Sequence, residues 1–556
     1  MPGGLLTLVS TGPENVILNS NPKKSFFKAV YAKHTNFGMQ KFILNYDKEK
    51  ELSFLSETDF TFKVPRFGDL INDTFISLKL PKIYSPFYYF ATGNTNAEKY
   101  IPYKFQWIKN LGTSMIKEIQ IYAGGLTLAK YSGEYIHCIV NRDLNKTKKD
   151  IFDKITGHTN ELNDPEAYIK QFCPHANNPD YPTSYANAET TGETTEASIQ
   201  EQTLHIPLYS WFSQSSKLAL PLIALQYQEV FIKITFRPIK ELYTILDVES
   251  IAGGGTGGEN IPEEEWENHR ISPNPNNALH QLNRFLRVPK DDDKQSNPVV
   301  NTPNNWFSNL HLSATYIFLD EHERNKFAKE GMSFLIKQVV EHEFLSKTGS
   351  KKIDVDSAHC VTNYMLRFRR SDVNDRNEWT NFTNWDYENK LPQFTKSTII
   401  DGALKKNIIG NIGIYPKNIK NILLDMGIIL NGDYRENILD KNVYLYSEKY
   451  SRTNGIFKEG LYHYSFALNT DLHTYQPSGS MNMSKFDHIT FEYNTVVPPK
   501  NDNNKVEFMC AGNGDILGIR QDSNEVYKYN YDFKVFEERY NVITIANGNI
   551  NLMLTN

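Results

Sequence analysis

The feature of this sequence that most restricts its fold is a recurring pattern of short alternating segments separated by tight-turn residues. Ile119 and Ile121 precede Gly124-Gly125, and alternating leucines follow, which is typical of a hairpin with a two-residue turn. Residues 230–237 alternate between apolar and polar side chains, as a half-buried strand does. Asn-Gly pairs, which readily supply the positive φ of hairpin turns, repeat this signal at residues 431–432, 513–514 and 547–548. The pattern predicts an all-β chain with antiparallel strands.

Helical signals are few and short. The clearest helix begins at Asp320, with Glu323 three residues later in the spacing of a capping box, and is expected to end at Gly331. A second helix is expected from Glu134 to about Leu144. Many strands, few helices and frequent turns predict sandwiches or barrels.

Two stretches resemble long loops rather than strands. Residues 143–203 are polar and rich in Asn, Thr, Glu and Pro, and residues 241–305 combine a glycine run with acidic and Asn/Pro-rich segments. Loops of this length are uncommon inside a compact domain and are usually functional sites or linkers. The second stretch divides the 556 residues into halves of similar size, so we expect two or three domains.

The overall charge and hydropathy exclude several classes of protein. The formal net charge of −5 opposes a protein that coats nucleic acid, since such binding depends on excess positive charge. No apolar run approaches the length that spans a bilayer, and the N-terminus lacks the basic region of a signal peptide. Aromatic residues make up 13% of the chain, which excludes disorder throughout.

The candidate sites for chemistry are weak. The glycine run 253–258 lacks the Gly-Lys-Ser/Thr of a phosphate-binding loop and is interpreted as a linker. The acidic cluster 263–267 contains a tryptophan and could suggest a glycosidase, but adjacent acids on a loop hold no fixed separation. We therefore expect no catalytic residues and no cofactor.

No metal site is expected either. Cys173 with His175, and His359 with Cys360, lack the spacing of zinc sites, and Asp291–Asp293 is better interpreted as a solvated loop than as a calcium site. The four cysteines lie far apart, which fits free thiols in a reducing compartment better than a disulfide framework.

Four Asn-x-Ser/Thr sequences are possible glycan acceptors, at Asn72, Asn145, Asn381 and Asn482. Asn145 and Asn381 lie in polar stretches and are the better two candidates, although such sequences arise often by chance in an Asn-rich chain. By residue chemistry alone, the chain is a β-rich protein with a binding or a structural role.

Longer strings decide between these roles, because they resemble, in order, the major capsid proteins of nucleocytoplasmic large DNA viruses. The matches in the first half are Asn21-Pro22, Phe26–Tyr31, Lys33–Phe37, Arg66–Leu70, Trp107, Ile116–Ile119, Gly124-Gly125, Tyr131–Tyr135 and Leu218–Tyr227. Those in the second half are Tyr316–Asp320, Glu323-Arg324, Phe327-Ala328, Tyr464–Leu468, Gln476–Ser484 and Tyr540–Ile543.

The resemblance implies two consecutive eight-stranded antiparallel jelly-roll sandwiches, a double jelly-roll, with few short helices and long loops. The expected division is an N-terminal arm at 1–22, a first jelly roll at 23–240 with a long loop at 143–203, an interdomain loop at 241–305, and a second jelly roll at 306–556 with an expanded loop at 495–535. It also implies a homotrimer of pseudo-hexagonal outline that tiles an icosahedral virion shell. Neighbouring capsomers and minor capsid proteins beneath the shell are the expected partners, with assembly in the host cytoplasm, no membrane span and no specific binding of nucleic acid.

The residues that carry the resemblance are interpreted as structural motifs. Pro221 and Pro477 are expected to stop or shape strands, Asp320 to cap a helix, and Asn21-Pro22 to separate the arm from the first strand. The complete set is Asn21, Pro22, Phe26, Phe27, His34, Thr35, Asn36, Phe37, Gly124, Gly125, Gly133, Glu134, Pro221, Gln226, Tyr227, Asp320, Arg324, Phe466, Gln476, Pro477, Ser478, Gly479 and Asn482.

The alternatives are a double jelly-roll scaffold protein, a minor capsid paralogue and, more distantly, a carbohydrate-binding β-sandwich protein.

Overall fold

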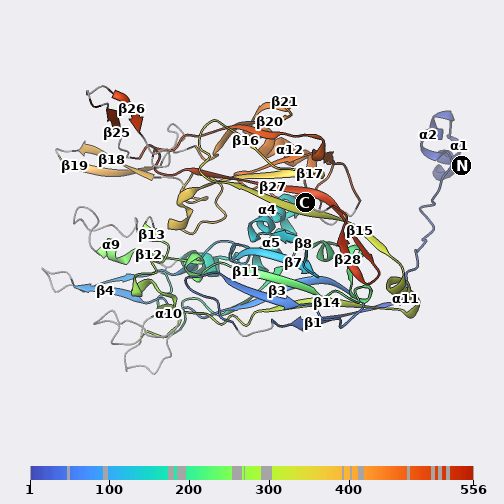
Figure 1. Ribbon diagram of the computed structural model, residues 1–556, viewed down its shortest axis with the longest axis horizontal. Coiled ribbons are helices and arrows are strands. Elements are labelled where there is room, and N and C mark those ends of the chain that lie inside the picture. Colours follow the sequence, from blue (N-terminus) through green and yellow to red (C-terminus); the bar gives the residue numbers. More distant parts are fainter. Residues whose placement is uncertain are drawn as a thin grey trace.

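The computed structural model shows two β-sandwiches side by side (Figure 1). It describes residues 2–46, 50–91, 98–172, 181–184, 196–252, 266–267, 269–289, 304–390, 393–400, 403–410, 419–471, 476–501, 507–510, 512, 516–520 and 526–554.

The first sandwich packs two antiparallel sheets around an apolar core. One sheet has the order β1-β14-β3, with β9 and β10 both pairing along the free edge of β3; the other has the order β2-β11-β7-β8. The strands are β1 Phe37–Leu44, β2 Thr58–Lys63, β3 Leu70–Leu80, β7 Ile116–Ala123, β8 Leu126–Tyr131, β9 Gln202–Pro207, β10 Leu220–Pro221, β11 Val230–Phe236 and β14 His311–Leu319.

The second sandwich repeats this arrangement. One sheet has the order β15-β27-β17-β22, and the other the order β16-β24-β20-β21. The strands are β15 Met332–Phe344, β16 Lys351–Asp354, β17 Cys360–Arg370, β20 Leu423–Leu430, β21 Asp433–Asp440, β22 Leu461–Ser465, β24 Ile489–Thr495 and β27 Tyr531–Ala546, with the short β23 Met481–Asn482 and β28 Asn549–Leu552 at the margins.

Both sandwiches have the same connectivity. Numbering the eight main strands of each unit in chain order gives sheets of order 1-8-3-6 and 2-7-4-5 in both. This is the jelly-roll topology, so the chain is a double jelly-roll, as predicted. Strand alternation explains the layers, since β11 buries every second residue as the sequence pattern predicts.

The predicted boundary between the units is wrong at one strand. β14 lies within the range 306–556 that was assigned to the second jelly roll, but it pairs with β1 and β3 of the first. Its central place in that sheet makes it the eighth strand of the first unit. Residues 241–305 therefore connect the seventh and eighth strands of one jelly roll and are not an interdomain linker.

Two long connections of each unit extend from the same end of the molecule, on the left in Figure 1. In the first unit they are the loop between its third and fourth strands and the loop between its seventh and eighth, and in the second unit the equivalent two. They contain β4 Phe87–Ala91, β5 Glu98–Pro102, β6 Gln106–Trp107, β12 Tyr243–Leu246, β13 Arg270–Ile271, β18 Gln393–Ile400, β19 Ala403–Gly410, β25 Glu507–Cys510 and β26 Ile516–Arg520.

Short helices fill the remaining connections, and the predicted loop 143–203 is largely helical in its first part. Lys146–Ile155 forms a helix because Asn145 caps it and Phe152 faces the core. The α-helices are α1 Gly3–Val9, α2 Val16–Asn19, α3 Leu111–Ser114, α4 Gly133–Asp143, α5 Lys146–Ile155, α6 Asn160–Asn163, α7 Pro165–Phe172, α8 Trp211–Gln214, α9 Val248–Ala252, α10 Leu282–Phe285, α11 Glu321–Lys329 and α12 Glu448–Arg452. Tighter or wider turns are η1 Pro13–Asn15, η2 Ser216–Leu218, η3 Leu222–Ala224, η4 Ile239–Glu241, η7 Ala278–His280, η9 Ser371–Asp375, η11 Val443–Ser447 and η12 Met483–Lys485.

The helix predicted from Asp320 exists, but its ends differ from the prediction. Asp320 occupies the N-cap position without a side-chain hydrogen bond, and Glu323 accepts a hydrogen bond from Thr35 instead of completing a capping box. The helix ends at Lys329, and Gly331 is not in the left-handed region that a C-terminal glycine cap uses. The helix predicted at 134–144 is confirmed as α4.

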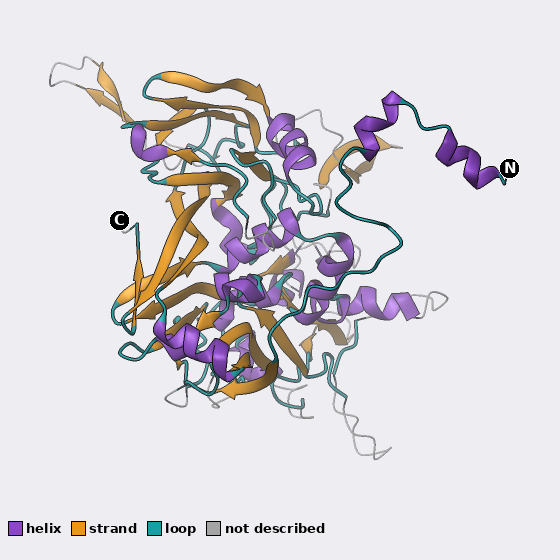
Figure 2. Ribbon diagram, turned by 90° about the vertical axis from the view of Figure 1, so that its right-hand side faces the viewer, coloured by secondary structure: helices purple, strands orange, loops and turns teal. Residues whose placement is uncertain are grey.

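The predicted hairpin turns at Gly124-Gly125, Asn431-Gly432 and Asn547-Gly548 are confirmed, each with positive φ at both positions. Asn513-Gly514 lies outside the described residues. The N-terminal arm extends further than residue 22, because β1 begins only at Phe37 (Figure 2).

Candidate functional site

Helix α4 is the element that joins the two jelly rolls. It follows β8 of the first unit, and its residues are almost all buried. Gly133 allows the close approach, because a Cβ there would lie 2.0 Å from the carbonyl oxygen of Thr113. Ser132 caps the helix by accepting a hydrogen bond from the backbone N–H of Tyr135. The helix thus lies between the first unit and the outward face of the β15-β27-β17 sheet.

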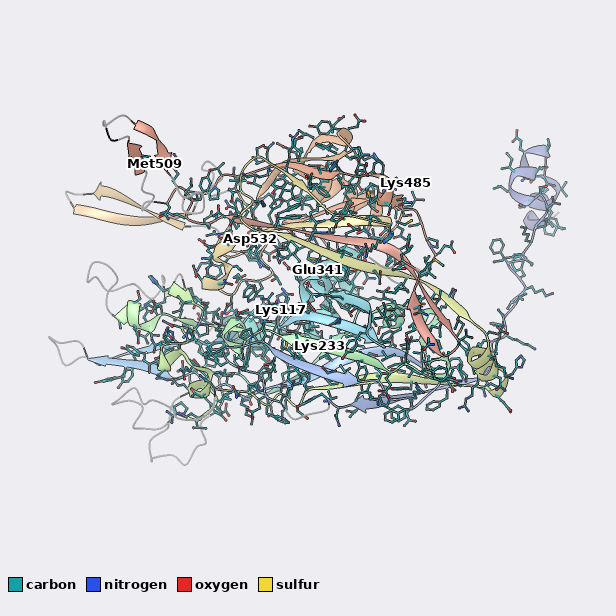
Figure 3. The ribbon with its side chains drawn as sticks, in the orientation of Figure 1. Lys117, Lys233, Glu341, Lys485, Met509 and Asp532 are labelled. Atoms are coloured by element: carbon teal, nitrogen blue, oxygen red, sulfur yellow. The ribbon has the colours of Figure 1, made fainter. Side chains whose placement is uncertain are left out.

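A first cluster of buried charges connects the start of α4 to this sheet. The Glu134 carboxylate accepts from the Arg367 guanidinium at 2.7 and 3.1 Å and from Arg369 at 3.1 Å. It also lies 3.2 Å from the Lys534 ammonium, which contacts Glu341 at 2.8 Å. Figure 3 shows Glu341 between the two units. Burial acts to raise the pKa of Glu134, but the neighbouring cations hold it well below its ordinary value.

A second cluster lies at the end of α4. Arg142, 1% exposed, donates to Asp143 at 2.6 Å and to Asn363 at 2.9 Å, and lies 2.9 Å from Glu538. Glu538 also accepts from the Tyr135 hydroxyl at 2.7 Å. Because both charges are fully buried and hydrogen-bonded, removing one would leave the other uncompensated.

The second unit also closes tightly around α4. Gly455, in the connection between β21 and β22, donates its N–H to the carbonyl of Arg142 at 2.8 Å. A Cβ at Gly455 would lie 2.2 Å from the Arg142 backbone. The main apolar core continues across the junction, since Met365, Leu461 and Phe536 of the second unit pack into the core of the first. The two jelly rolls are therefore one packed body.

The outer face of β1 in the first unit, unlike the buried face around α4, is exposed. Phe37, Met39 and Ile43 lie on one face of this edge strand, with the exposed Lys41 between the last two, and are 49%, 63% and 63% exposed. Exposed apolar side chains gathered on one face are typical of an interaction surface. We call these three residues the β1 face.

The N-terminal arm is a second exposed apolar segment. Phe26 and Phe27 are fully exposed, and the leucines of α1 are about half exposed or more. The end of the arm touches the body through a hydrogen bond from Thr35 Oγ1 to Glu323 at 2.5 Å and through the ring of His34, which lies 5.7 Å from that of Phe37. Figure 2 shows the arm leaving the body.

The structure places the predicted motif residues in separate regions. Asn21, with φ of 50°, and Pro22 lie within the arm; His34 bonds the carbonyl of its neighbour Thr35. Asn36 is exposed just before β1. Gly124-Gly125 form the β7–β8 turn, whereas Gly133 and Glu134 start α4 at the junction. Of the predicted set, therefore, Gly133 and Glu134 take part in the junction.

The others support local geometry. Pro221 pairs with Leu70 at a sheet margin, the Gln226 carbonyl accepts from Arg66, and Tyr227 packs over Gly548. Arg324 contacts Asp69 at 3.0 Å. Near the end of the second unit, Phe466 packs on Tyr364, Gln476 and Pro477 are exposed, Ser478 donates to the Asn469 carbonyl, Gly479 has φ of 134°, and Asn482 pairs with Cys360.

The two preferred glycan acceptors differ in the structure. Asn145 is exposed, although its side chain also caps α5. Asn381 is 6% exposed, and its amide nitrogen, the atom that would carry the glycan, donates to the carbonyls of Trp385 and Asp386. The interpretation of Asn381 as an acceptor is therefore wrong for the folded chain.

The described residues contain no group of three or more His, Cys, Asp or Glu side chains placed to hold a metal ion. Burial raises the pKa of the Cys138 thiol, which makes it unreactive. Over the same residues no helix is long and apolar enough to cross a membrane. Residues 253–258, Glu263–Glu265, Asp291–Asp293, Cys173 and His175 lie outside the described part.

Sequence reasoning missed most of the junction residues, including Arg142, Arg367, Arg369, Lys534 and Glu538. One signal was present: these charges lie within strands or a helix that also carry many apolar residues. Charged residues inside otherwise buried elements are seldom found unless they are paired.

Two family models match the chain in consecutive segments. "Major capsid protein N-terminus" matches residues 25–263, and "Large eukaryotic DNA virus major capsid protein" matches residues 323–550. The chain belongs to the major capsid protein family of large eukaryotic DNA viruses. Capsid proteins of this family are structural proteins and not enzymes, so the chain is a structural component of a virion capsid.

Individual relatives agree with this assignment. The capsid protein is 25% identical over 540 residues to probable capsid protein 4 of Acanthamoeba polyphaga mimivirus, covering 88% of this chain and 92% of the relative. It is 23% identical over 500 residues to the major capsid protein of Paramecium bursaria Chlorella virus 1, covering 88% and 86%. The quasi-atomic model of the PBCV-1 virus capsid matches with a TM-score of 0.58 and 17% identity, covering 96% of this chain and 100% of that one, which shows the shared fold.

Proposed function

We propose that this chain forms homotrimeric capsomers of pseudo-hexagonal outline that tile an icosahedral virion shell. The single observation that carries the proposal is the repeated topology, with sheet orders 1-8-3-6 and 2-7-4-5 in both units. Three chains, each contributing two similar jelly rolls, supply six similar units around one axis. Such a unit packs hexagonally, as the facets of a shell require.

The rigid junction supports this proposal. Capsomers can tile evenly only if the two jelly rolls of one chain keep a fixed relation. The shared apolar core and the buried charge clusters around α4 supply that fixed relation.

The two ends of the molecule suggest its orientation in the shell. The long connections with β18, β19, β25 and β26 extend from one end, and the arm leaves near α11 at the other (Figure 1). We infer that the loops face outwards. The exposed apolar arm then lies under the shell, where minor capsid proteins or neighbouring capsomers cover it. We further infer assembly in the host cytoplasm and no specific binding of nucleic acid.

The β1 face is the surface that we assign to contacts between chains. A permanent interface should bury more than about 2,000 Å² and resemble a core in its apolarity. Met39 and Ile43 are exposed apolar side chains on a regular strand. Their contact with water is unfavourable in an isolated chain, and association with another chain would remove it.

Light scattering of the purified full chain tests the proposal, with negative-stain images alongside. We expect a mass near three times 64.1 kDa and a hexagonal outline. The double substitution Met39→Glu and Ile43→Glu should shift the mass towards the monomer. The matched variant Met39→Leu and Ile43→Val keeps the apolar surface and should remain trimeric. A wild-type chain that stays monomeric at high concentration and shows no hexagonal particles would contradict the trimer.

A further inference from the structure

The contact between the two jelly rolls of one chain follows a simple rule. The fifth strand of the first unit, β8, lies beside the first strand of the second unit, β15, where Gln338 donates to the Leu128 carbonyl at 2.8 Å. The helix that follows the fifth strand, α4, covers the outward face of β27 and β17 through Glu134 and Tyr135. The 1-8-3-6 sheet of one unit thus receives the fifth strand and the following helix of the other unit.

The second unit has the same two elements, but there they are exposed. On its fifth strand, β21, Tyr434 and Ile438 are each 46% exposed. On the helical turns that follow, η11 and α12, Tyr446 is 46% exposed and Tyr450 is 92% exposed. Tyr446 stacks on the exposed ring of Phe457, with the ring centroids 5.0 Å apart. We call these five residues the β21–α12 face.

The helical part of this face lacks the charges of a surface that faces water. Residues 443–457 are all described, and their exposed side chains are uncharged: Tyr446, Ser447, Tyr450, Ser451, Asn454 and Phe457. A helix that faces water usually carries charged residues on its exposed side. Tyrosine is enriched and charge is depleted where proteins meet, so this surface has the composition of a protein interface.

The surface that would receive this face extends beyond the β1 face. Ile43 pairs with Ser313 of β14, and Ser313 pairs with Phe75 of β3, so the three residues form one row across the sheet. Phe75 is half-buried, whereas its neighbour Ile76 points into the core. An apolar row therefore continues from β1 across the outward face of the first unit.

The exposed charges of the two surfaces have opposite signs. Lys41 is the exposed charge of β1, and Asp433 and Asp440 are exposed at the two ends of β21. The exposed Arg435 of β21 is paired with Glu436 at 2.7 Å. Opposite charges on two apolar surfaces favour their association and help to fix its register.

The two surfaces lie on opposite sides of the molecule. Figure 1 shows β21 at the top of the second unit and β1 at the bottom of the first. Two different patches on opposite sides of one chain fit a head-to-tail contact between copies, which closes into a ring when the rotation permits it. A twofold contact of the β1 face with itself would instead leave the β21–α12 face exposed.

We propose that the β21–α12 face of one chain docks on the β1 face of a second copy, as β8 and α4 dock on the second unit within one chain. The inference rests on the trimer proposed above and names the two surfaces that form it. Around the capsomer axis, every contact then joins a fifth strand and its helix to a 1-8-3-6 sheet, alternately within a chain and between chains. Six similar contacts between six jelly rolls account for a hexagonal outline.

The test uses the full chain with one cysteine on each surface, Ile43→Cys together with Ile438→Cys. A short bismaleimide links nearby thiols, denaturing gels show the covalent species, and mass spectrometry identifies the linked positions and separates them from links through native cysteines. We expect covalent dimers and trimers of the 64.1 kDa chain, linked between positions 43 and 438.

The matched control combines Ile43→Cys with Asn325→Cys. Asn325 is exposed on α11, at the right of Figure 1 and away from β21, so this pair should form no link between chains. Trimers that form no link between positions 43 and 438, that link position 43 to position 43, or that link the control pair equally well would overturn the inference and leave the trimer itself standing. A wild-type chain that stays monomeric would contradict both.

A second variant tests the helical part of the face without cysteines. Tyr450→Glu places a charge on the exposed side of α12 and should raise the concentration at which the trimer dissociates about tenfold or more, as substitutions at central interface residues do. Tyr450→Phe keeps the aromatic ring and should leave dissociation unchanged. Equal dissociation of the Tyr450→Glu and wild-type trimers, measured by light scattering on dilution, would also overturn the inference.

Discussion

The β1-β14-β3 sheet of the first jelly roll and the β15-β27-β17 sheet of the second have the same topology, but their outward faces lie in different environments. In the second unit, the outward face of the β15-β27-β17 sheet carries Arg367, Lys534 and Glu538, yet it is buried against α4. In the first unit, the equivalent sheet carries Phe37, Met39 and Ile43 on β1, and these are exposed. Charged side chains are thus buried and apolar side chains exposed, which is the reverse of the usual distribution in proteins.

The difference teaches where each contact is formed. Buried charges are tolerated in the second unit because every partner belongs to the same chain and is fixed on folding. The exposed apolar residues of the β1 face have no covering element among the described residues of the same chain, so we expect a second chain to cover them. The first contact builds the subunit, and we propose that the second builds the capsomer.

The largest effect is expected from breaking the buried charges. Arg142→Met removes the cation between Asp143 and Glu538 and leaves both carboxylates buried. Removing one partner of a buried pair costs about 3–5 kcal/mol. Urea unfolding of the variant and wild type measures this difference.

The exposed pair Lys233–Asp59, at 2.9 Å, is the matched control for that experiment. Lys233→Met should cost less than about 1 kcal/mol, because water screens a surface pair. Equal losses in the two variants would show that the α4 junction does not depend on its charges.

A smaller effect is expected from pH, through His463 on β22. Burial, together with the nearby charge of Arg142, lowers the pKa of His463 from about 6.5 to about 3. The folded chain keeps this ring neutral while the unfolded chain takes up a proton. The free energy of unfolding is therefore unaffected by His463 above about pH 6.5. It declines as the pH falls from there towards 3, by about 1.4 kcal/mol per pH unit at most.

Urea midpoints measured between pH 7 and pH 5 test this dependence. In the His463→Gln variant, the free energy of unfolding should fall less steeply with decreasing pH, because the unfolded chain takes up one proton fewer. Burial acts to raise the pKa of Glu538, but Arg142 and Lys337 lower it to about 2. The stability that Glu538 contributes is therefore lost only below about pH 4.5, outside the pH range in which His463 is tested. An unchanged slope between pH 7 and pH 5 in the variant would show that His463 does not titrate as expected.

The smallest effect compares equivalent turns of the two units. Gly125 closes β7–β8 with φ of 86°, and Gly432 closes β20–β21 with φ of 94°. A Cβ at either position meets no neighbouring atom within 4 Å, so only the backbone conformation opposes substitution. Gly125→Val and Gly432→Val should each cost about 1–2 kcal/mol, and lower the yield of soluble trimer similarly. Melting curves with clearly unequal shifts would show that the two turns are not equivalent.

Local patterns were enough to predict much of the fold. Alternation at 230–237 and the glycine turn at Gly124-Gly125 depend on residues close in sequence, and both are confirmed. The assignment of β14 failed because strand pairing joins Phe37 to Leu319 across nearly the whole first unit, and no local pattern specifies that partner. The helical part of 143–203 was missed because its helices are short and polar on most faces.

The sequence by itself determined the two sandwiches, three of their hairpin turns and the membership of the family, since alternation, turn residues and ordered motifs are all readable along the chain. Only the tertiary structure decided that Arg142 and Glu538 share one buried site while Met39 and Ile43 stay exposed. The physical reason is that burial depends on which surfaces meet. A charged residue on a strand lies in water or in the interior according to what packs over it, and α4 is placed there by contacts between residues far apart in sequence.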